Sequence, residues 1–433
     1  MDLTNRHECS LSGICGGCTY STCTYEEQLK IKDEDIRRLM KEAECSEDIY
    51  EGILGSPLIF AYRNKMEFSF GDSEKNGPLT LGLHRKKSFY DIVDTDCCLI
   101  THEDFNEIQR LTRAYFGDLG LTYMDKRSHR GYLRHLLVRR SVNTSQILID
   151  LVTTSQPLIP VMGHRLINDP VLYDKEAMAQ GIIKASDAVN VYDEEDVLRG
   201  FTEEILRAKR EGRIEGEICS ILHTVNDRPA DAIINEGTSI LFGTEHITEE
   251  LCGLSFKITP FSFFQTNTRS AELIYNKAVS YISGELGRDK VCFDLFSGTG
   301  TITQIIASSV KRAVGVEIVP EAVDAARENA GLNGLKNCEF ICGDVFEVLR
   351  NLDETPDAVI LDPPRDGVSP KALDIICSYG VPEMVYISCK PQSFFRDLQI
   401  LRERGYEVSR MCSIDQFPWT KNCELVADLR RRY

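Results

Sequence analysis

The chain has 433 residues, of which 42% are hydrophobic, and its formal net charge is −17. This length fits two or three domains with sizeable cores, and the acidic balance argues against nonspecific nucleic-acid binding unless positive charge is concentrated locally. No apolar run is long enough to span a membrane, and the first residues lack a signal peptide's apolar segment, so we expect a cytoplasmic protein. Its sixteen cysteines are then expected to be thiols or metal ligands rather than disulfides.

Three cysteines lie within ten residues near the amino terminus, with glycines between them. Cys9, Cys15 and Cys18 can therefore converge their sulfurs on one point, a spacing that suits a zinc site or an iron–sulfur cluster. The spacing leaves open both the metal and the fourth ligand that such a site needs. The candidates for that ligand are Cys23, which is nearest in sequence, and the distant Cys97 and Cys98.

The central part of the chain reads as β-rich. Helical apolar spacing over residues 25–43 precedes it, and strands are expected at 65–70, 79–83 and 141–152, with an exposed helix at 203–214. Residues 126–140 hold six Lys or Arg, two His and no acid. In so acidic a chain this run indicates either a phosphate-bearing partner or a solvated charged face. On the first interpretation, Arg130 and Arg134 are expected to contact RNA phosphates.

From about residue 251 strands and helices alternate, which is typical of a parallel sheet covered by helices. The expected helices are 270–286, 302–309 and 320–333, and the expected strands are 291–296, 312–317, 338–344, 357–361, 384–389, 406–414 and 425–429. Pro391 cannot continue a strand, so Cys389 should lie at the carboxyl end, where ligands bind in open α/β sheets. A thiol there could act as a nucleophile, although a buried structural cysteine is the commoner case.

The strand at 291–296 leads into Ser-Gly-Thr-Gly-Thr at 297–301, whose glycines let the backbone approach a nucleotide-like ligand. Glu317 ends the next strand and is placed to accept hydrogen bonds from ribose hydroxyls. Dinucleotide oxidoreductases and S-adenosylmethionine methyltransferases share this arrangement. The third glycine of G-x-G-x-x-G is missing, which favours S-adenosylmethionine because that molecule has no phosphate. Asp344 and Asp362 end the following strands in the same way.

In combination these motifs resemble the RNA uracil-5-methyltransferases, over nearly the whole chain. The stretches that carry the resemblance are 133–135, 263–267, 294–300, 362–365 (Asp-Pro-Pro-Arg), 388–391 (Ser-Cys-Lys-Pro) and 415–418 (Asp-Gln-Phe-Pro) through Glu424. The resemblance implies that Cys389 adds to carbon 6 of uracil, because carbon 5 is too weak a nucleophile to take a methyl group unaided. It also implies that Glu424 is the base that removes the proton from carbon 5. The residues implied to line the S-adenosylmethionine site are Gln265, Phe296, Glu317 and Asp362, with Thr301 and Asp344.

The amino-terminal cysteine set is similar to that of the ribosomal RNA branch of this family, which carries a [4Fe-4S] cluster. The fourth cluster cysteine of that branch follows a segment like Ile92-Val93-Asp94, which matches Cys98 better than Cys97. The resemblance therefore implies 23S ribosomal RNA as the substrate, with transfer RNA, whose enzymes lack the cluster, as the alternative. The implied cluster ligands are Cys9, Cys15, Cys18 and Cys98.

Three departures from the family pattern bear on how the substrate is positioned. The cluster motif begins at Cys9, so the amino-terminal oligonucleotide-binding barrel of many members is expected to be absent. Lys390 follows the cysteine where asparagine is usual, and the segment Trp419-Thr420-Lys421-Asn422-Cys423 stands where the family carries histidines.

The predicted fold class is α/β, in three regions. An iron–sulfur loop and helix (1–45, completed by Cys98) and a β-rich α+β RNA-binding domain (46–250) precede a Rossmann-like class I S-adenosylmethionine methyltransferase domain (251–433). We expect a monomer that acts on RNA and binds neither DNA nor membranes. An iron–sulfur oxidoreductase is the competing enzyme class, but the sequence contains neither the G-x-G-x-x-G turn nor the flavin motif that would favour it. A noncatalytic RNA-binding module would not need the intact Cys389 and Glu424.

Overall fold

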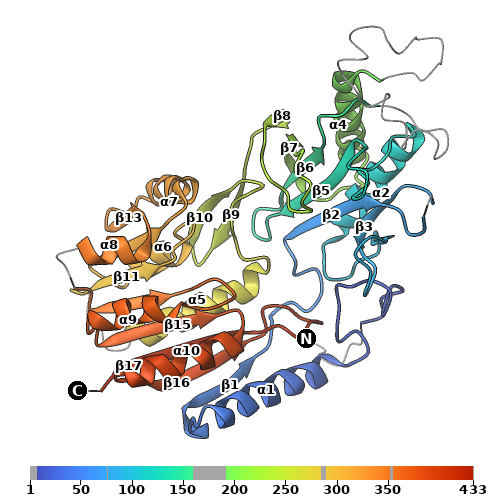
Figure 1. Cartoon of the computed structure of the whole chain (residues 1–433). Helices are drawn as coiled ribbons and strands as arrows, with labels where there is room; N and C mark the ends of the chain where they lie inside the picture. Colours follow the sequence, from blue (N-terminus) through green and yellow to red (C-terminus); the bar gives the residue numbers. More distant parts are fainter. Residues whose placement is uncertain (1–6, 76, 159–191, 284–288, 352–354, 433) are drawn as a thin grey trace.

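Two large sheets organise the chain in the computed structural model (Figure 1). One has eight strands and the other has seven, and a two-stranded sheet of β9 (Ile247–Leu251) and β10 (Leu254–Ile258) lies between them. The change of pattern expected near residue 251 therefore falls at this small sheet. The structure describes residues 7–75, 77–158, 192–283, 289–351 and 355–432.

The eight-stranded sheet is mixed. In order across the sheet, its strands are β1 (Tyr50–Leu54), β16 (Tyr406–Ile414), β17 (Glu424–Arg431), β15 (Glu383–Ser388), β14 (Ala358–Leu361), β11 (Val291–Leu295), β12 (Arg312–Glu317) and β13 (Cys338–Cys342). The run from β15 to β13 is parallel, whereas β17 is antiparallel to both of its neighbours. Carboxyl ends of the parallel strands thus meet the start of β17 at one edge of the sheet.

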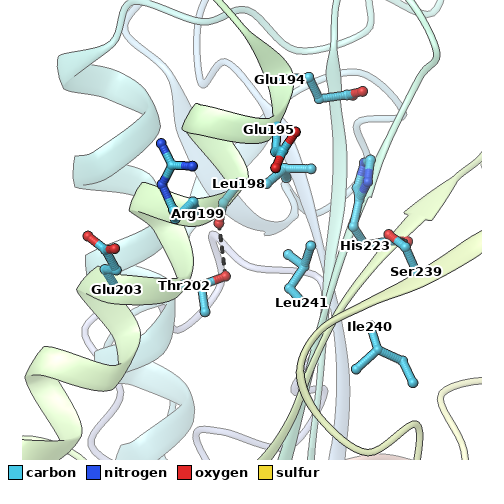
Figure 2. A pocket seen from close by; sticks show the side chains of 10 residues that line it. All are labelled: Glu194, Glu195, Leu198, Arg199, Thr202, Glu203, His223, Ser239, Ile240 and Leu241. Carbon is cyan, nitrogen blue, oxygen red and sulfur yellow. Dashed lines mark hydrogen bonds between the residues drawn. The ribbon is translucent and has the colours of Figure 1, made fainter.

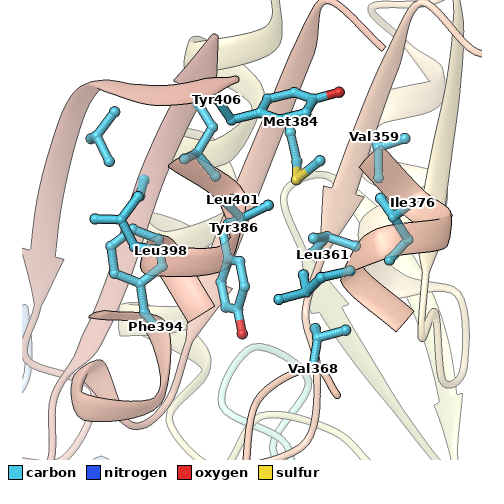
Figure 3. Packing of buried hydrophobic residues seen from close by; sticks show 14 of the residues in the cluster. Val359, Leu361, Val368, Ile376, Met384, Tyr386, Phe394, Leu398, Leu401 and Tyr406 are labelled. Atoms are coloured by element: carbon cyan, nitrogen blue, oxygen red, sulfur yellow. The ribbon is translucent and has the colours of Figure 1, made fainter. Parts of the chain in front are cut away.

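Helices cover both faces of this sheet. α1 (Tyr25–Glu42) precedes β1, and α5 (Thr268–Ser283) lies between β10 and the first parallel strand. One helix follows each parallel strand: α6 (Thr301–Ala307), α7 (Pro320–Leu332), α8 (Val345–Asn351), α9 (Pro370–Ser378) and α10 (Pro391–Glu403). Side chains alternate along β15, so Met384 and Tyr386 pack with α9 and α10, as Figure 3 shows, while Val385 and Ile387 pack with α5 and α6. Burial on both faces explains the continuous apolar run that predicts this strand.

The seven-stranded sheet forms the central region. Its order is β4 (Ile92–Asp94), β3 (Thr80–His84), β2 (Lys65–Gly71), β5 (Leu133–Arg140), β6 (Gln146–Thr153), β7 (Glu217–Val225) and β8 (Thr238–Gly243). Two helices pack on it and on each other, α2 (Glu103–Asp118) and α4 (Glu194–Arg210). The helix predicted at 203–214 is wrong in its bounds, because Asp193 caps α4 by accepting from the amide of Asp196.

The amino-terminal elements join the C-terminal sheet rather than the central one. After the short 3-10 helix η1 (Glu47–Ile49), β1 pairs in parallel with β16, and α1 packs against β1 and α10. The domain limits at residues 46 and 251 stay a prediction, with β1 crossing from one predicted region into the sheet of another. Among the described residues, none of the helices combines the length and the apolar character that a membrane span needs.

Candidate active site

Cys389 lies in the turn between the end of β15 and the start of α10, at the carboxyl edge of the parallel strands. The turn is held by Ser388, whose hydroxyl donates to the Lys390 carbonyl at 2.9 Å and accepts from the Lys390 amide at 3.3 Å. Pro391 is the first residue of α10, where its missing N–H costs nothing. The thiol therefore lies near the positive end of the α10 helix dipole, which stabilises a thiolate and opposes part of the effect of burial on its pKa.

Glu424 is brought to Cys389 by strand order. β17 runs antiparallel to β15, with Leu425 opposite Ser388, so the first residue of β17 adjoins the residue after β15. Burial and then the charges of Glu424 and Asp362 raise the pKa of the Cys389 thiol to about 11, whereas Arg365 lowers it. Cys389 and Glu424, the two residues predicted to act on the substrate, are therefore close enough to interact electrostatically.

Two further carboxyl groups complete an acidic cluster at the strand ends. Asp362 follows β14, and burial together with the charge of Asp294 raises its pKa to about 7. Burial, and next the charge of Asp362, raise the pKa of Glu424 to about 8. Burial likewise raises the pKa of Asp294, on β11, to about 7, although a hydrogen bond from the Thr303 hydroxyl at 2.6 Å opposes the shift. Carboxyl groups whose pKa lies near neutrality can exchange protons at physiological pH.

The glycine-containing turn after β11 takes a tight left-handed path. Phe296, Gly298 and Gly300 have φ angles of 69°, 53° and 71°. A Cβ on Gly300 would lie 2.4 Å from the ring of Phe340, so both the backbone conformation and the space require glycine there. The turn leads into α6, of which Thr301 is the first residue.

Glu317 ties this turn to the end of β12. One carboxylate oxygen accepts from the Gly298 amide at 3.0 Å, and the other accepts from the amides of Ile318 and Val319, each at 2.9 Å. Asp344 lies at the start of α8, where it accepts from the amide of Phe346 at 2.9 Å. Both acids predicted to contact S-adenosylmethionine therefore also shape the loops at the sheet edge.

Gln265 lies where the central region meets the C-terminal sheet. Its carbonyl oxygen accepts from the side-chain amide of Asn64 at 2.9 Å, and Asn64 also donates to Thr268 at 2.9 Å. The side-chain oxygen of Gln265 accepts from Gln416 at 3.2 Å. The Gln265 amide nitrogen carries two N–H donors, and a hydrogen bond with Tyr275 uses one of them, so one remains for a ligand.

Tyr275 is a residue that the sequence analysis missed. It lies on α5, and its pKa is raised well above the usual range by burial and then by the charges of Asp362, Glu424 and Asp294, against a hydrogen bond with Gln265. Its hydroxyl therefore stays protonated inside the acidic cluster. An aromatic residue at helical spacing reads as core from sequence, and no local signal marks this one out.

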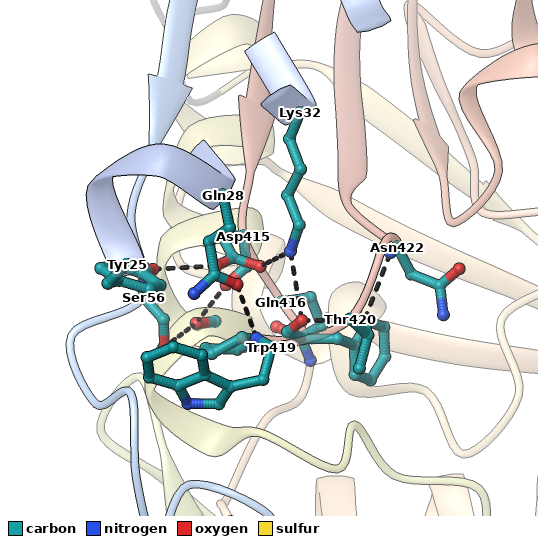
Figure 4. Close-up of polar contacts among 12 residues, drawn as sticks. Tyr25, Gln28, Lys32, Ser56, Asp415, Gln416, Trp419, Thr420 and Asn422 are labelled. Carbon is teal, nitrogen blue, oxygen red and sulfur yellow. Dashed lines mark hydrogen bonds and ion pairs between the residues drawn. The ribbon is translucent and has the colours of Figure 1, made fainter. Parts of the chain in front are cut away.

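A buried polar network holds the segment between β16 and β17 (Figure 4). Asp415, directly after β16, forms an ion pair with Lys32 at 2.6 Å and accepts from the Tyr25 hydroxyl at 2.9 Å. Lys32 also donates to the carbonyl of Phe417 at 3.2 Å. Side chains of α1 thereby fix the path of the chain that leads to Glu424.

Trp419, the first residue of the atypical 419–423 segment, is fully buried within this network. Its amide donates to Gln28 of α1 at 2.6 Å, and its indole N–H donates to the carbonyl of Ile59 at 2.6 Å. Its carbonyl accepts from the amides of Thr19 and Tyr20, at 2.8 and 2.9 Å. The segment that departs from the family pattern thus connects the cysteine loop to the candidate active site.

The amino-terminal cysteines lie together with Cys97 and Cys98. Burial raises the pKa of the Cys18 thiol to about 12, and the charges of Cys98, Cys15 and Cys9 add to this shift. Burial raises the pKa of the Cys9 thiol, and the charge of Cys97 adds to this shift. Within the ranges that the structure describes, no group of three or more His, Cys, Asp or Glu side chains is arranged as a metal site. The cluster is not shown and stays a prediction.

Arg134 does not have the predicted role. Its side chain is only 5% exposed, and its guanidinium donates to the carbonyls of Asn226, Arg228 and Ala230 at 2.6–2.7 Å. These bonds hold the loop after β7, so the guanidinium is committed to backbone groups rather than to RNA phosphates. Arg130 is partly exposed, and its contact with RNA stays a prediction.

A cavity of about 440 Å³ lies away from the strand ends, in the central region (Figure 2). Its lining residues come from α4, β7 and β8, and they are Glu194, Glu195, Leu198, Arg199, Thr202, Glu203, His223, Ser239, Ile240 and Leu241. None of the predicted site residues is among them. The strand-end cluster, not this cavity, is therefore the candidate active site.

Comparisons with known proteins agree with this geometry. The model of the tRNA (uracil-5-)-methyltransferase family matches residues 233–432. An RNA methyltransferase of Caldanaerobacter subterraneus is 41% identical over 98% of this chain and 84% of its own length. One of Clostridium tetani is 40% identical, with the same coverage.

A solved structure agrees as well. The tRNA (uracil-54, C5)-methyltransferase of Pyrococcus abyssi, in complex with S-adenosyl-L-homocysteine, superposes with a TM-score of 0.68 and 24% identity, over 96% of this chain and 86% of that one. This likeness confirms the predicted α/β fold with its Rossmann-like methyltransferase domain. The family model and the relatives show that the chain belongs to the RNA uracil-5-methyltransferase family, whose members are S-adenosylmethionine-dependent enzymes.

Proposed function

We propose that the protein methylates carbon 5 of a specific uridine in 23S ribosomal RNA through a covalent bond between Cys389 and the uracil ring. The observation that carries this proposal is the meeting of Cys389, Glu424 and Asp362 at the ends of three adjacent strands. A nucleophile and a base of shifted pKa within one buried cluster are what the reaction needs.

The reaction begins with the Cys389 thiolate adding to carbon 6 of uracil. The electron pair of the C5–C6 double bond moves toward the C4 oxygen, and the resulting enolate makes carbon 5 nucleophilic. Hydrogen-bond donors support this enolate, and the Gln265 amide, oriented by Gln416, is placed to be one. Bound S-adenosylmethionine supplies the methyl group that carbon 5 takes.

Product release needs a base. Carbon 5 then carries both the new methyl group and its original proton, and Glu424 takes that proton. The electron pair restores the C5–C6 double bond, the bond from carbon 6 to sulfur breaks, and Cys389 leaves as a thiolate. A carboxylate with a pKa of about 8 is a stronger base than an ordinary glutamate, which suits the removal of a carbon-bound proton.

The S-adenosylmethionine site is proposed to lie over the turn at 297–301. Glu317 would accept from ribose hydroxyls through Oε2, which accepts only the Gly298 amide and keeps acceptor capacity, whereas Oε1 already accepts two amides. The other residues proposed to line it are Gln265, Phe296, Thr301, Asp344 and Asp362. A target base in folded RNA must be unstacked and turned outward to reach Cys389 from this side.

We also propose that Cys9, Cys15, Cys18 and Cys98 hold a [4Fe-4S] cluster. The proximity of these thiols supports it, because Cys9, Cys15 and Cys98 each raise the pKa of at least one other of the four, and four thiolates are the ligand set of such a cluster. Cys97 also raises the pKa of Cys9 and of Cys15, so the fourth ligand needs a direct test.

Anaerobically purified protein is expected to be brown and to contain about four irons per chain, as four-thiolate clusters require. Cys98→Ser should lose the iron, whereas Cys97→Ser should retain it. The iron content and the visible absorption spectrum of both variants are measured. Stoichiometric zinc in place of iron would contradict the cluster, and loss of iron in Cys97→Ser alone would reverse the choice of ligand.

The choice of ribosomal RNA rests on the cysteine set. Transfer RNA is the second candidate, favoured by the match to the tRNA (uracil-5-)-methyltransferase family model and by the likeness to the transfer RNA enzyme of Pyrococcus abyssi. We propose a monomer that acts in the cytoplasm and on RNA only.

Mapping 5-methyluridine tests the function and the substrate together. Ribosomal and transfer RNA from cells with and without the protein are digested and analysed by mass spectrometry. We expect one or more 5-methyluridines in 23S ribosomal RNA to disappear with the protein. Loss confined to transfer RNA would move the substrate to the second candidate, and unchanged 5-methyluridine in both would refute the function.

A further inference from the structure

Two neighbouring aromatic side chains are exposed on the turn between β3 and β4, which we call the aromatic hairpin (residues 85–91). Phe89 is 63% exposed and Tyr90 is 50% exposed. Their rings form an edge-to-face pair, with centroids 5.4 Å apart at 87°. Exposing two adjacent aromatic rings to water is unfavourable, and such a pair is typical of a surface that a binding partner covers.

Cations surround these rings. The Nζ of Lys126 lies 4.6 Å from the centroid of Phe89, and the guanidinium carbon of Arg127 lies 4.7 Å from that of Tyr90. Lys86 and Lys87, on the hairpin itself, are exposed. Each aromatic face thus has a basic side chain beside it, the pairing of stacking surface and positive charge that single-stranded nucleic acid requires.

Acids only partly offset this charge. Residues 84–91 hold three Lys or Arg and one acid, and so do residues 125–130, in a chain whose net charge is −17. Asp91 lies 3.8 Å from Arg85, and Asp231 lies 2.9 Å from Lys126. The surface of the aromatic hairpin and residues 126–127 therefore stays positive against an acidic background, which favours a polyanion over an acidic protein face.

The hairpin is held in one conformation. The Arg85 amide donates to the Asp91 carbonyl at 2.9 Å, and the Ser88 hydroxyl accepts from the Asp91 amide at 3.1 Å. The loop that carries Cys9, Cys15 and Cys18 contacts the hairpin, since the Lys86 amide donates to the carbonyl of Ile14 at 2.7 Å. A preorganised hairpin binds without the entropy cost of ordering a loop.

We propose that this surface binds a single-stranded RNA segment flanking the target uridine, with nucleobases stacked on Phe89 and Tyr90 and phosphates beside Lys86, Lys87 and the nearby basic residues. The hairpin contacts the chain just after β2, since the Arg85 guanidinium donates to the carbonyl of Ser73 at 3.5 Å. Asn64, just before β2, donates to the carbonyl of Gln265. β2, which is about 20 Å long for seven residues, therefore separates the aromatic hairpin from Gln265 at the candidate active site. The proposal rests on the proposed function, because it assigns the surface to the same RNA.

The test measures binding of a fluorescein-labelled single-stranded RNA of about 20 nucleotides, longer than one typical site, by anisotropy at several salt concentrations without S-adenosylmethionine. The double variant Phe89→Ala/Tyr90→Ala should lose about tenfold or more in affinity, with the salt slope unchanged, because stacking contributes without releasing counterions. Lys86→Ala/Lys87→Ala should instead reduce the salt slope by about 1.4, the value for two phosphate contacts on a single strand.

Two controls keep the result specific. Ile240→Ala/Phe242→Ala removes another exposed apolar pair of the same sheet and should bind RNA as the wild type does. Phe89→Trp/Tyr90→Trp preserves the stacking faces and should retain wild-type affinity. Wild-type affinity in Phe89→Ala/Tyr90→Ala, or an equal loss in the Ile240→Ala/Phe242→Ala control, overturns the proposal.

Turnover separates this proposal from the proposed function. With full-length substrate RNA, Phe89→Ala/Tyr90→Ala should raise KM about tenfold and leave kcat unchanged, because the hairpin touches no reacting atom. A wild-type protein that binds RNA but forms no 5-methyluridine refutes the proposed function alone. A wild-type protein that forms it, beside a double variant of unchanged KM, refutes the RNA surface alone.

Discussion

Replacing Cys389 by alanine is expected to abolish methyl transfer, and replacing Glu424 by glutamine is expected to leave methylated RNA bound to the protein. The alanine variant cannot add to carbon 6, so it forms neither product nor adduct. The glutamine variant can still add and can still accept the methyl group on carbon 5. It cannot remove the remaining proton, and losing a general base typically costs on the order of a hundredfold or more in rate.

The two outcomes are read on a denaturing gel with methyl-labelled S-adenosylmethionine. Glu424→Gln should show a labelled band of slow mobility, which Cys389→Ala should lack. Cys219→Ala, on β7 of the central sheet, removes a half-buried thiol outside the site and should turn over normally. Normal turnover by Glu424→Gln would assign the base to another group, with Asp362 the next to test.

The release step should also depend on pH in a defined direction. Burial and Asp362 raise the pKa of Glu424 to about 8, so this group is mostly protonated at pH 6 and mostly ionised at pH 9. Only the ionised form can take the proton from carbon 5. In the wild type, decay of the adduct after a single turnover should therefore accelerate as the pH rises through about 8, and in Glu424→Gln it should not.

Replacing Lys32 by methionine is expected to destabilise the fold by about 3 kcal/mol or more. Lys32 and Asp415 are 1% and 0% exposed and lie 2.6 Å apart. Removing one partner leaves a buried charge without its counterion, which is far costlier than losing an exposed pair. Asp415 retains only the Tyr25 hydroxyl from α1, which is a weaker partner than a cation.

A matched control lies two residues earlier on the same helix, on its exposed side. Lys30 is 78% exposed and lies 3.9 Å from Glu34, so Lys30→Met should change stability by less than about 0.5 kcal/mol. Urea unfolding monitored by circular dichroism compares the two variants. Equal stability of Lys32→Met and Lys30→Met would show that the buried pair does not hold α1 against the segment that leads to Glu424.

Much of the C-terminal sheet could be predicted from sequence. β12 and β16 have the predicted bounds, and the other predicted strands of this sheet differ by one or two residues, because short apolar runs ending at an acid or a turn are unambiguous for strands buried on both faces. α2 was not predicted, since it buries polar side chains such as Asp104, Asn106 and Gln109, which hide its apolar period. β1 could not be assigned to its sheet because its partner, β16, lies more than 350 residues later.

Of the candidate site too, only a part could be predicted from the sequence. Cys389 and Glu424 were found because short motifs carry them, and the antiparallel pairing of β15 and β17 explains why they meet. Tyr275 and Gln416 join the site only through contacts between distant parts of the chain. The prediction for Arg134 was wrong because a sequence shows a positive charge but not the backbone carbonyls that surround it.

The most direct test of covalent catalysis is to locate the trapped bond. The Glu424→Gln adduct is digested with nuclease and protease, and the modified peptide is sequenced by mass spectrometry. The mechanism predicts a single modified cysteine among the sixteen, Cys389, carrying one 5-methyluridine nucleotide. A nucleotide attached to any other cysteine, or a stalled enzyme with methylated RNA and no protein–RNA bond, would contradict it.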